Sequence, residues 1–234
     1  MTVQVVSHGF MRQLSTNNGT TGPVSVSCPP NSLIVAAVVG TGSNPNTTLL
    51  SRFAGTPFQG SGLGFVTGDF ALRMDIAACP VRFAQTSAPL DYTPAAGATS
   101  ASGYYWVLSG ARHATGTGWV GSNNTSDLSS AETLSVPALT PTVTGSRYFA
   151  CTAILRNSTV ALTDETTDFL STGGVAFCGA FGHRATTNTV GDSGVTYSMT
   201  RSTGTSGAAT GCVLALEVLP QSGPYAAWGW GAAA

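Results

Sequence analysis

No stretch of a dozen residues in this 234-residue chain places apolar side chains three and four positions apart among helix-forming residues. Gly, Ser, Thr and Val dominate instead, and the apolar residues fall in short runs separated by polar clusters such as 17–23 and 202–207. Those clusters contain Gly, Pro, Asn and Ser, which tolerate positive φ or fix a turn, whereas β-branched residues favour strands. The pattern therefore predicts an all-β chain.

Short strand-like segments follow one another along the whole chain, and the longest of them indicate which strands lie at the centre of a sheet. Val24–Cys28 alternates apolar and polar residues, as a half-buried strand does. Leu33–Val39 and Cys212–Val218 are nearly continuous apolar runs, so we expect central strands that are covered on both faces. The predicted strands are Thr2–Val6, Val24–Cys28, Leu33–Val39, Leu49–Phe53, Phe70–Ala77, Tyr104–Leu108, Gly118–Gly121, Glu132–Val136, Tyr148–Leu155, Val160–Thr163, Gly174–Phe181, Gly194–Met199 and Cys212–Leu219.

This series predicts an antiparallel β-sandwich, jelly-roll-like, with long loops and an extended C-terminal arm. One domain is expected over residues 1–220, because no linker-like stretch interrupts the strands before that point. Residues 83–102 carry the weakest pattern and are expected to form a long loop. Residues 221–234 form an aromatic, Gly/Ala-rich arm.

Two parts of the sequence resemble each other. Residues 24–36 are a short strand, a Pro-bearing turn and an apolar strand, and residues 134–141 followed by 147–153 repeat that order. Two hairpins of one sandwich would give the same resemblance without any duplication of the chain.

The surface of such a sandwich must be unusually poor in charge. Asp, Glu, Lys and Arg make up 8% of the residues, and the nine basic residues are all Arg. An ordinary soluble domain carries about a quarter of charged residues. A coat of Ser, Thr, Asn, Gly and Ala loses little hydration and little side-chain entropy when it packs against a neighbour. We therefore expect a permanent assembly, with a homo-oligomer as its unit.

Composition also argues against two classes of partner. The formal net charge is −1, and no cluster of basic residues is available to bind nucleic acid or an acidic membrane surface. The N-terminal residues lack the basic and apolar segments of a signal peptide, and the apolar run Leu33–Val39 is too short to span a bilayer. The chain is thus expected to be made in a cytoplasm, where the five Cys are expected to stay reduced and structural.

A succession of segments resembles a family of virion proteins. The segments are residues 29–39, 103–111, 135–146, 172–177 and 208–220. Their order is similar to that in a large, diverse group of β-sandwich proteins of tailed phages and prophages, which serve as capsid decoration, cement or tail-associated proteins. The resemblance spans roughly residues 20–220 and carries no catalytic signature. The resemblance implies that the protein is located in the virion. It also implies that its partners are the major capsid protein or other virion proteins. The chain departs from the commoner pattern at residues 119–124 and in the aromatic arm.

Several motifs could suggest an enzyme. Gly191-Asp-Ser-Gly194 matches the tetrapeptide that holds the nucleophile of chymotrypsin-type proteases, but Val195 stands where a further Gly is expected. His8 and His113 also lack the expected setting, and Asp, Ser and Gly form ordinary hairpin turns. We therefore predict no enzymatic activity and no catalytic residue.

No metal site or cofactor is predicted either. His8, His113 and His183 stand apart from one another in the sequence and are expected on the surface or in loops. The acidic cluster Asp164–Asp168 lacks the spacing of a calcium loop and is interpreted as a solvated turn. Gly60–Gly64 resembles a phosphate loop, but no helix follows it, so a flexible segment is the better interpretation.

The aromatic residues suggest where partners bind. Tyr225, Trp228 and Trp230 in the arm are too few to form a core, and they are expected to dock on a neighbouring subunit, the alternative being the chain's own sandwich. Trp106 and Trp119 are candidates for stacking on sugar rings. Because side chains alternate along a strand, Tyr105 is expected to point away from Tyr104 and Trp106.

Two functions are therefore expected from the sequence. The first is a structural virion protein of a tailed bacteriophage, which decorates or cements the capsid. The alternative is a receptor- or glycan-binding module carried on the tail or capsid, with a host surface glycan as its partner.

Overall fold

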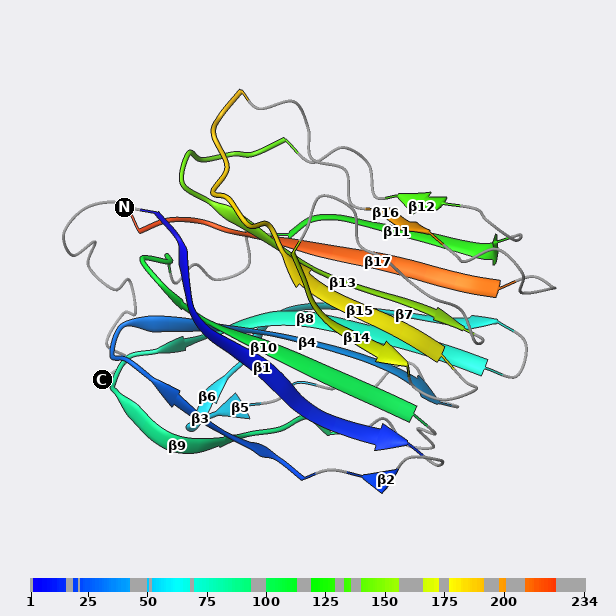
Figure 1. Ribbon diagram of the computed structural model, residues 1–234, viewed down its shortest axis with the longest axis horizontal. Helices are drawn as coiled ribbons and strands as arrows, with labels where there is room; N and C mark the ends of the chain where they lie inside the picture. Colours follow the sequence, from blue (N-terminus) through cyan, green and yellow to red (C-terminus); the bar gives the residue numbers. More distant parts are fainter. Residues whose placement is uncertain are drawn as a thin grey trace, which may run out of the picture.

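A computed structural model describes residues 2–15, 19–20, 22–42, 50, 52–67, 70–93, 100–112, 119–128, 133–135, 140–155, 166–172, 177–191, 198–200 and 209–221. The described residues form strands, turns and loops, and they include no helix that could cross a membrane. Two antiparallel sheets pack face to face, and smaller two-stranded sheets lie beside them (Figure 1). The predicted all-β sandwich is confirmed.

The first half of the chain forms a six-stranded sheet in the order β2-β1-β10-β4-β8-β7. Its strands are β1 (Gln4–Ser15), β2 (Gly19–Thr20), β4 (Ser32–Gly42), β7 (Gln59–Thr67), β8 (Phe70–Val81) and β10 (Ser100–Ser109). Two small sheets accompany it, formed by β3 (Val24–Cys28) with β9 (Gln85–Leu90) and by β5 (Arg52–Phe53) with β6 (Thr56–Pro57).

The second half forms a five-stranded sheet in the order β11-β17-β13-β15-β14. Its strands are β11 (Trp119–Leu128), β13 (Arg147–Leu155), β14 (Thr166–Thr172), β15 (Phe177–His183) and β17 (Ala209–Val218). The short strands β12 (Thr133–Ser135) and β16 (Ser198–Thr200) pair with each other.

The two halves repeat one topology. In each sheet the five long strands lie in the order first, last, second, fourth and third along the chain: β1-β10-β4-β8-β7 in one and β11-β17-β13-β15-β14 in the other. The short pair β3 and β9 corresponds to the short pair β12 and β16. In the first half β3 precedes β4 and β9 precedes β10, and in the second half β12 precedes β13 and β16 precedes β17. The sequence resemblance between residues 24–36 and 134–153 therefore falls on equivalent parts of two repeats.

The strand contacts across the sandwich are consistent with an approximate two-fold axis between the repeats. β4 lies against its counterpart β13, and the contact of β13 with β8 is matched by that of β4 with β15. Likewise, β17 touches β8 and β10 touches β15. In Figure 1 the pair β3 and β9 lies below one sheet, while β12 and β16 lie above the other.

Two hydrophobic cores explain why the central strands are apolar on both faces. Along β4, Leu33, Val35 and Ala37 enter the core between the two sheets, whereas Ile34 and Ala36 enter a second core on the other face of the six-stranded sheet. The second core also contains Val26 and Leu90 of β3 and β9 and Phe53 of β5, so these small sheets form part of a third layer. The prediction that Leu33–Val39 and Cys212–Val218 form central strands is confirmed.

Three sequence predictions need correction. Residues 83–102 are not one long loop, because they include β9 and the start of β10. β9 pairs with β3, a strand that is distant from it in the sequence. Gly60–Gly64 is part of the regular strand β7 and is held by its pairing with β8. Thr166–Asp168 of the expected acidic turn begins β14, while Asp164 and Glu165 lie outside the described residues, as does the predicted strand Val160–Thr163.

Candidate functional site

Trp106 lies at the centre of the core between the sheets. Its side chain is 0% exposed, and its ring centroid lies 5.2 Å from that of Tyr104 and 5.3 Å from that of Phe149. The predicted alternation is confirmed, because Tyr104 and Trp106 enter this core while Tyr105 enters the other. A ring without exposed surface offers no face to a sugar, so the suggested stacking role of Trp106 is wrong.

The side chains of the other aromatic candidates, Trp119 and the three aromatic residues of the arm, lie outside the described part of the chain. Trp119 begins β11 and pairs with Leu216 of β17, but its side chain lies outside what the structure describes. Tyr225, Trp228 and Trp230 lie outside the described residues altogether.

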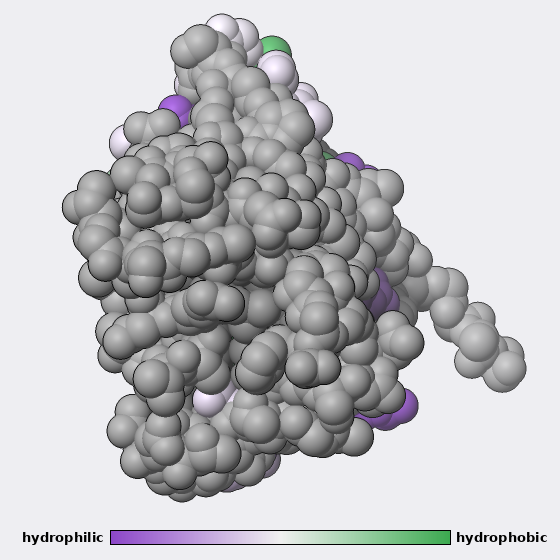
Figure 2. Space-filling model, turned by 90° about the vertical axis from the view of Figure 1, so that its right-hand side faces the viewer, coloured by the Kyte–Doolittle hydropathy of each residue, from purple (hydrophilic) through white to green (hydrophobic). Residues whose placement is uncertain are grey.

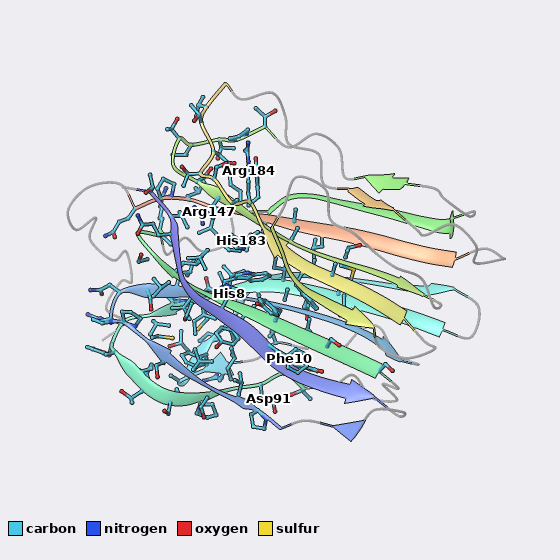
Figure 3. The ribbon with its side chains drawn as sticks, in the orientation of Figure 1. His8, Phe10, Asp91, Arg147, His183 and Arg184 are labelled. Atoms are coloured by element: carbon cyan, nitrogen blue, oxygen red, sulfur yellow. The ribbon has the colours of Figure 1, made fainter. Side chains whose placement is uncertain are left out.

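Two of the three histidines come together between β1 and β15 (Figure 3). The ring centroids of His8 and His183 are 6.1 Å apart, and Nδ1 of His8 lies 2.5 Å from the hydroxyl oxygen of Tyr104. His183 is buried and stacks on Phe149 with a centroid distance of 6.0 Å. The expectation of a surface or loop histidine is therefore wrong for the buried His183, whereas His8 is exposed as expected, although it lies in β1 and contacts His183. His113 lies outside the described residues. Within the described part of the chain, no three His, Cys, Asp or Glu side chains are grouped as a metal site would require.

A buried carboxylate organises one end of the sandwich. Glu217 of β17 is 3% exposed and accepts hydrogen bonds from the backbone N–H of Thr142 (3.1 Å), the hydroxyl of Thr142 (2.9 Å) and the hydroxyl of Ser146 (2.6 Å). Asn188 donates to the Ser146 hydroxyl oxygen at 3.0 Å, and Arg184 donates to the side-chain oxygen of Asn188. Burial and the nearby Glu217 raise the pKa of Tyr148 above its ordinary value, against a lowering effect of Arg184. The network ties residues 140–147 and 184–191 to β17.

The N-terminal residues and Gln221, the last residue that the structure describes, are both bonded at this end of the molecule. The backbone N–H of Val3 donates to the carbonyl oxygen of Gly145 at 3.0 Å. The segments that follow the last strand of each repeat also pair, since Ala111 forms a bridge with Pro220 and Gln221 donates to the carbonyl oxygen of Gly110 at 2.7 Å. The arm therefore departs from a fixed point, because the chain is still bonded to the sandwich at Gln221.

The loops around this point expose apolar side chains. Val143 is 39% exposed and Val190 is 56% exposed, and the backbone N–H of Val190 bonds the hydroxyl oxygen of Thr144 at 3.0 Å, so the two loops lie together. We call Val143 and Val190 the valine patch. Its loops are held by the Glu217 network, so these apolar groups are presented on an ordered surface.

The described surface is almost without charge. Among the side chains that the structure describes, the exposed charged ones are three arginines, Arg52, Arg82 and Arg112. Of the described carboxylates, Asp75 and Glu217 are buried and Asp91 is half-buried. The described residues visible in Figure 2 range from white to purple, with a small strongly hydrophobic area at the top.

The described cysteines behave as core residues. Cys28, Cys79 and Cys151 are all buried. Burial raises the pKa of Cys28 to about 11 and the pKa of Cys79 to about 12, so both stay protonated thiols at neutral pH. A thiol is a weak nucleophile, so these two residues are poor candidates for catalysis.

The protease-like motif gives no further support for an enzyme. Gly191 has φ +97° and lies in a turn, while residues 192–194 lie outside the described part of the chain.

No family model, no curated protein and no solved structure matches this chain.

Proposed function

We propose that this protein is a structural subunit of a virion, which decorates or cements the capsid of a tailed bacteriophage and works by binding neighbouring subunits. The observation that carries the proposal is the low charge of the chain: charged residues make up 8% of the sequence, and the exposed charged residues among the described side chains are Arg52, Arg82 and Arg112. A neutral polar surface loses little hydration when it is covered, so a large permanent contact is favoured over a free monomer.

The valine patch supports the same proposal. Val143 and Val190 are exposed at the end of the sandwich from which the arm departs. Exposed apolar groups are typical of a surface that another subunit covers. The proposal also agrees with the resemblance of residues 20–220 to virion proteins of tailed phages.

The glycan-binding alternative loses one of its two residues, because Trp106 is in the core. It now depends on Trp119 alone. Binding to a glycan array that is lost in a Trp119→Ala variant would favour that function over the structural one.

The direct test is an inventory of purified particles. Mass spectrometry of the phage or prophage particles encoded with this chain should find the protein in many copies, in a fixed ratio to the major capsid protein. Adding the purified full-length protein to particles that lack it should restore that ratio and raise the temperature at which the heads open. Absence from particles, or a copy number that fits only a tail tip, would contradict the proposal.

A further inference from the structure

The outer strands of the two sheets differ in one respect. Over most of its length β1 is an outer strand, because β2 pairs only with Leu14 and Ser15. β1, β11 and β14 each carry at least one extra residue relative to the inner strand beside it: Val6 and Met11 in β1, Val120 in β11 and Asp168 in β14. In contrast, β7 pairs with β8 in unbroken register from Gln59 to Thr67.

Such extra residues are β-bulges, and they twist an outer strand so that a second chain cannot pair along it. Charges on an outer strand have the same effect. Arg12, Asp127 and Asp168 lie on the three bulged strands, whereas residues 59–67 contain no charged residue and no Pro. By both criteria β7 is the outer strand that remains open to pairing in the described part of the chain.

The internal repeat makes this comparison sharper. β7 and β14 are the third long strands of their repeats and lie at corresponding edges of the two sheets. One is interrupted by a charged bulge at Asp168, while the other is regular and neutral. The two edges therefore differ, although they occupy the same position in the same topology.

We propose that β7 is the dimerisation strand of this protein, and that it pairs antiparallel with β7 of a second copy to join two six-stranded sheets into one. This proposal deepens the assembly function and names its contact. A second copy is the fitting partner. A charged strand that pairs antiparallel with its own copy brings like charges close together, which is unfavourable. Among the outer strands β1, β7, β11 and β14, β7 is the one without a charged residue. A two-fold contact also closes on itself, so it yields a dimer and no fibre.

If all nine residues of β7 pair with β7 of the second copy, the two-fold axis passes through the middle residue of the strand, Leu63. Each Leu63 then lies directly opposite Leu63 of the partner subunit, and Gly60 lies opposite Val66 of the partner subunit. Within the chain, Gly60 pairs with Ala77 and Val66 with Ala71, so neither substitution lies directly opposite a charged residue of β8. The register thus gives two tests, one by charge and one by cross-linking.

In the charge test, the variant Gly60→Lys/Val66→Lys places two lysine pairs across the contact, and Gly60→Glu/Val66→Glu places two glutamate pairs there. Sedimentation equilibrium should show a dimer for the natural protein and roughly tenfold or greater weakening for each variant alone. Mixing the two variants should restore the dimer, because each lysine then faces a glutamate. The control Ser25→Lys/Thr86→Lys adds the same charge at exposed positions of β3 and β9 and should leave the dimer unchanged.

In the cross-linking test, Leu63→Cys should give a covalent dimer with oxidised glutathione, because cross-strand neighbours bring the two sulfur atoms within reach. Each disulfide releases two protons and two electrons, which reduce one molecule of the oxidised glutathione. Gly60→Cys is the matched control and should give no covalent dimer, since it faces Val66 of the partner subunit.

The proposal is overturned if the natural protein is monomeric at high concentration, if the charged variants dimerise as before, or if Leu63→Cys and Gly60→Cys cross-link equally. It is also overturned if a chain ending at Gln221 loses the dimer, because the arm would then be the contact. Circular dichroism melts show whether each variant is folded, and the Leu63→Cys result decides the matter if the charged variants are not. Failure here would leave particle binding, and hence the proposed function, to be judged by its own test.

Discussion

Glu217 holds several hydrogen-bond donors at one end of the sandwich, and its replacement tests that network. The change Glu217→Gln keeps the size of the side chain but replaces one of its two acceptor oxygens by a donor group, which meets the donors Thr142 and Ser146. Because an unsatisfied buried group costs about 1–3 kcal/mol, the free energy of unfolding should fall by that amount. Urea unfolding measures it. Thr186→Ala, at an exposed position of the same loops, is the control and should change stability by less than about 0.5 kcal/mol.

Cys28 and Cys79 predict how stability depends on pH. Burial raises their pKa values from the ordinary 9.0 to about 11 and about 12. The folded state therefore holds its protons more tightly than the unfolded state, so this contribution to stability is complete below pH 9 and is lost as the pH rises toward 12. The urea midpoint should fall over that range, and Cys28→Ala/Cys79→Ala should make the decline shallower. An equal slope in the variant would show that other groups cause it.

At the scale of single elements, the turn after β10 requires glycine for two reasons. Gly110 has φ +66°, and a Cβ there would collide with the carbonyl oxygen of Thr2. Gly55, in the turn between β5 and β6, has φ +82° and open space around it, so it isolates the backbone effect. Gly110→Ala should therefore cost about 1–3 kcal/mol more than Gly55→Ala. Thermal melting of the two variants measures the difference, and equal losses would mean that the N-terminal strand moves away at no cost.

At the scale of the whole molecule, attachment should depend little on salt. The exposed charges among the described side chains are three arginines, so apolar burial and neutral hydrogen bonds must supply most of the binding energy. We expect particle occupancy to change by less than about twofold between 50 mM and 1 M NaCl. Release of the protein at near-molar salt would show that the contact depends on charge.

The arm should matter for attachment and not for folding. A chain ending at Gln221 keeps the bond to Gly110 and should melt at the temperature of the natural protein. It should occupy fewer sites on particles, because a well-packed aromatic anchor contributes about 2–4 kcal/mol before the ordering cost is subtracted. Unchanged occupancy would remove the arm from the function. A large fall in melting temperature would instead place Tyr225, Trp228 and Trp230 in the protein's own core.

The sequence by itself determined the fold class, the central strands and the side-chain alternation of Tyr104, Tyr105 and Trp106. These depend on local propensity and on a two-residue period, which neighbouring residues specify. The resemblance between residues 24–36 and 134–153 could also be recognised from the sequence, because equivalent strands of the two repeats have similar packing requirements.

Only the tertiary structure decided the rest. Gly60–Gly64 and Thr166–Asp168 form strands because β8 and β15 pair with them, and such pairing depends on partners that local pattern does not specify. His8 and His183 are far apart in sequence and meet because the two repeats pack face to face. The same packing buries Trp106, which the sequence alone could not distinguish from a surface aromatic, since an apolar ring suits both a core and a binding face.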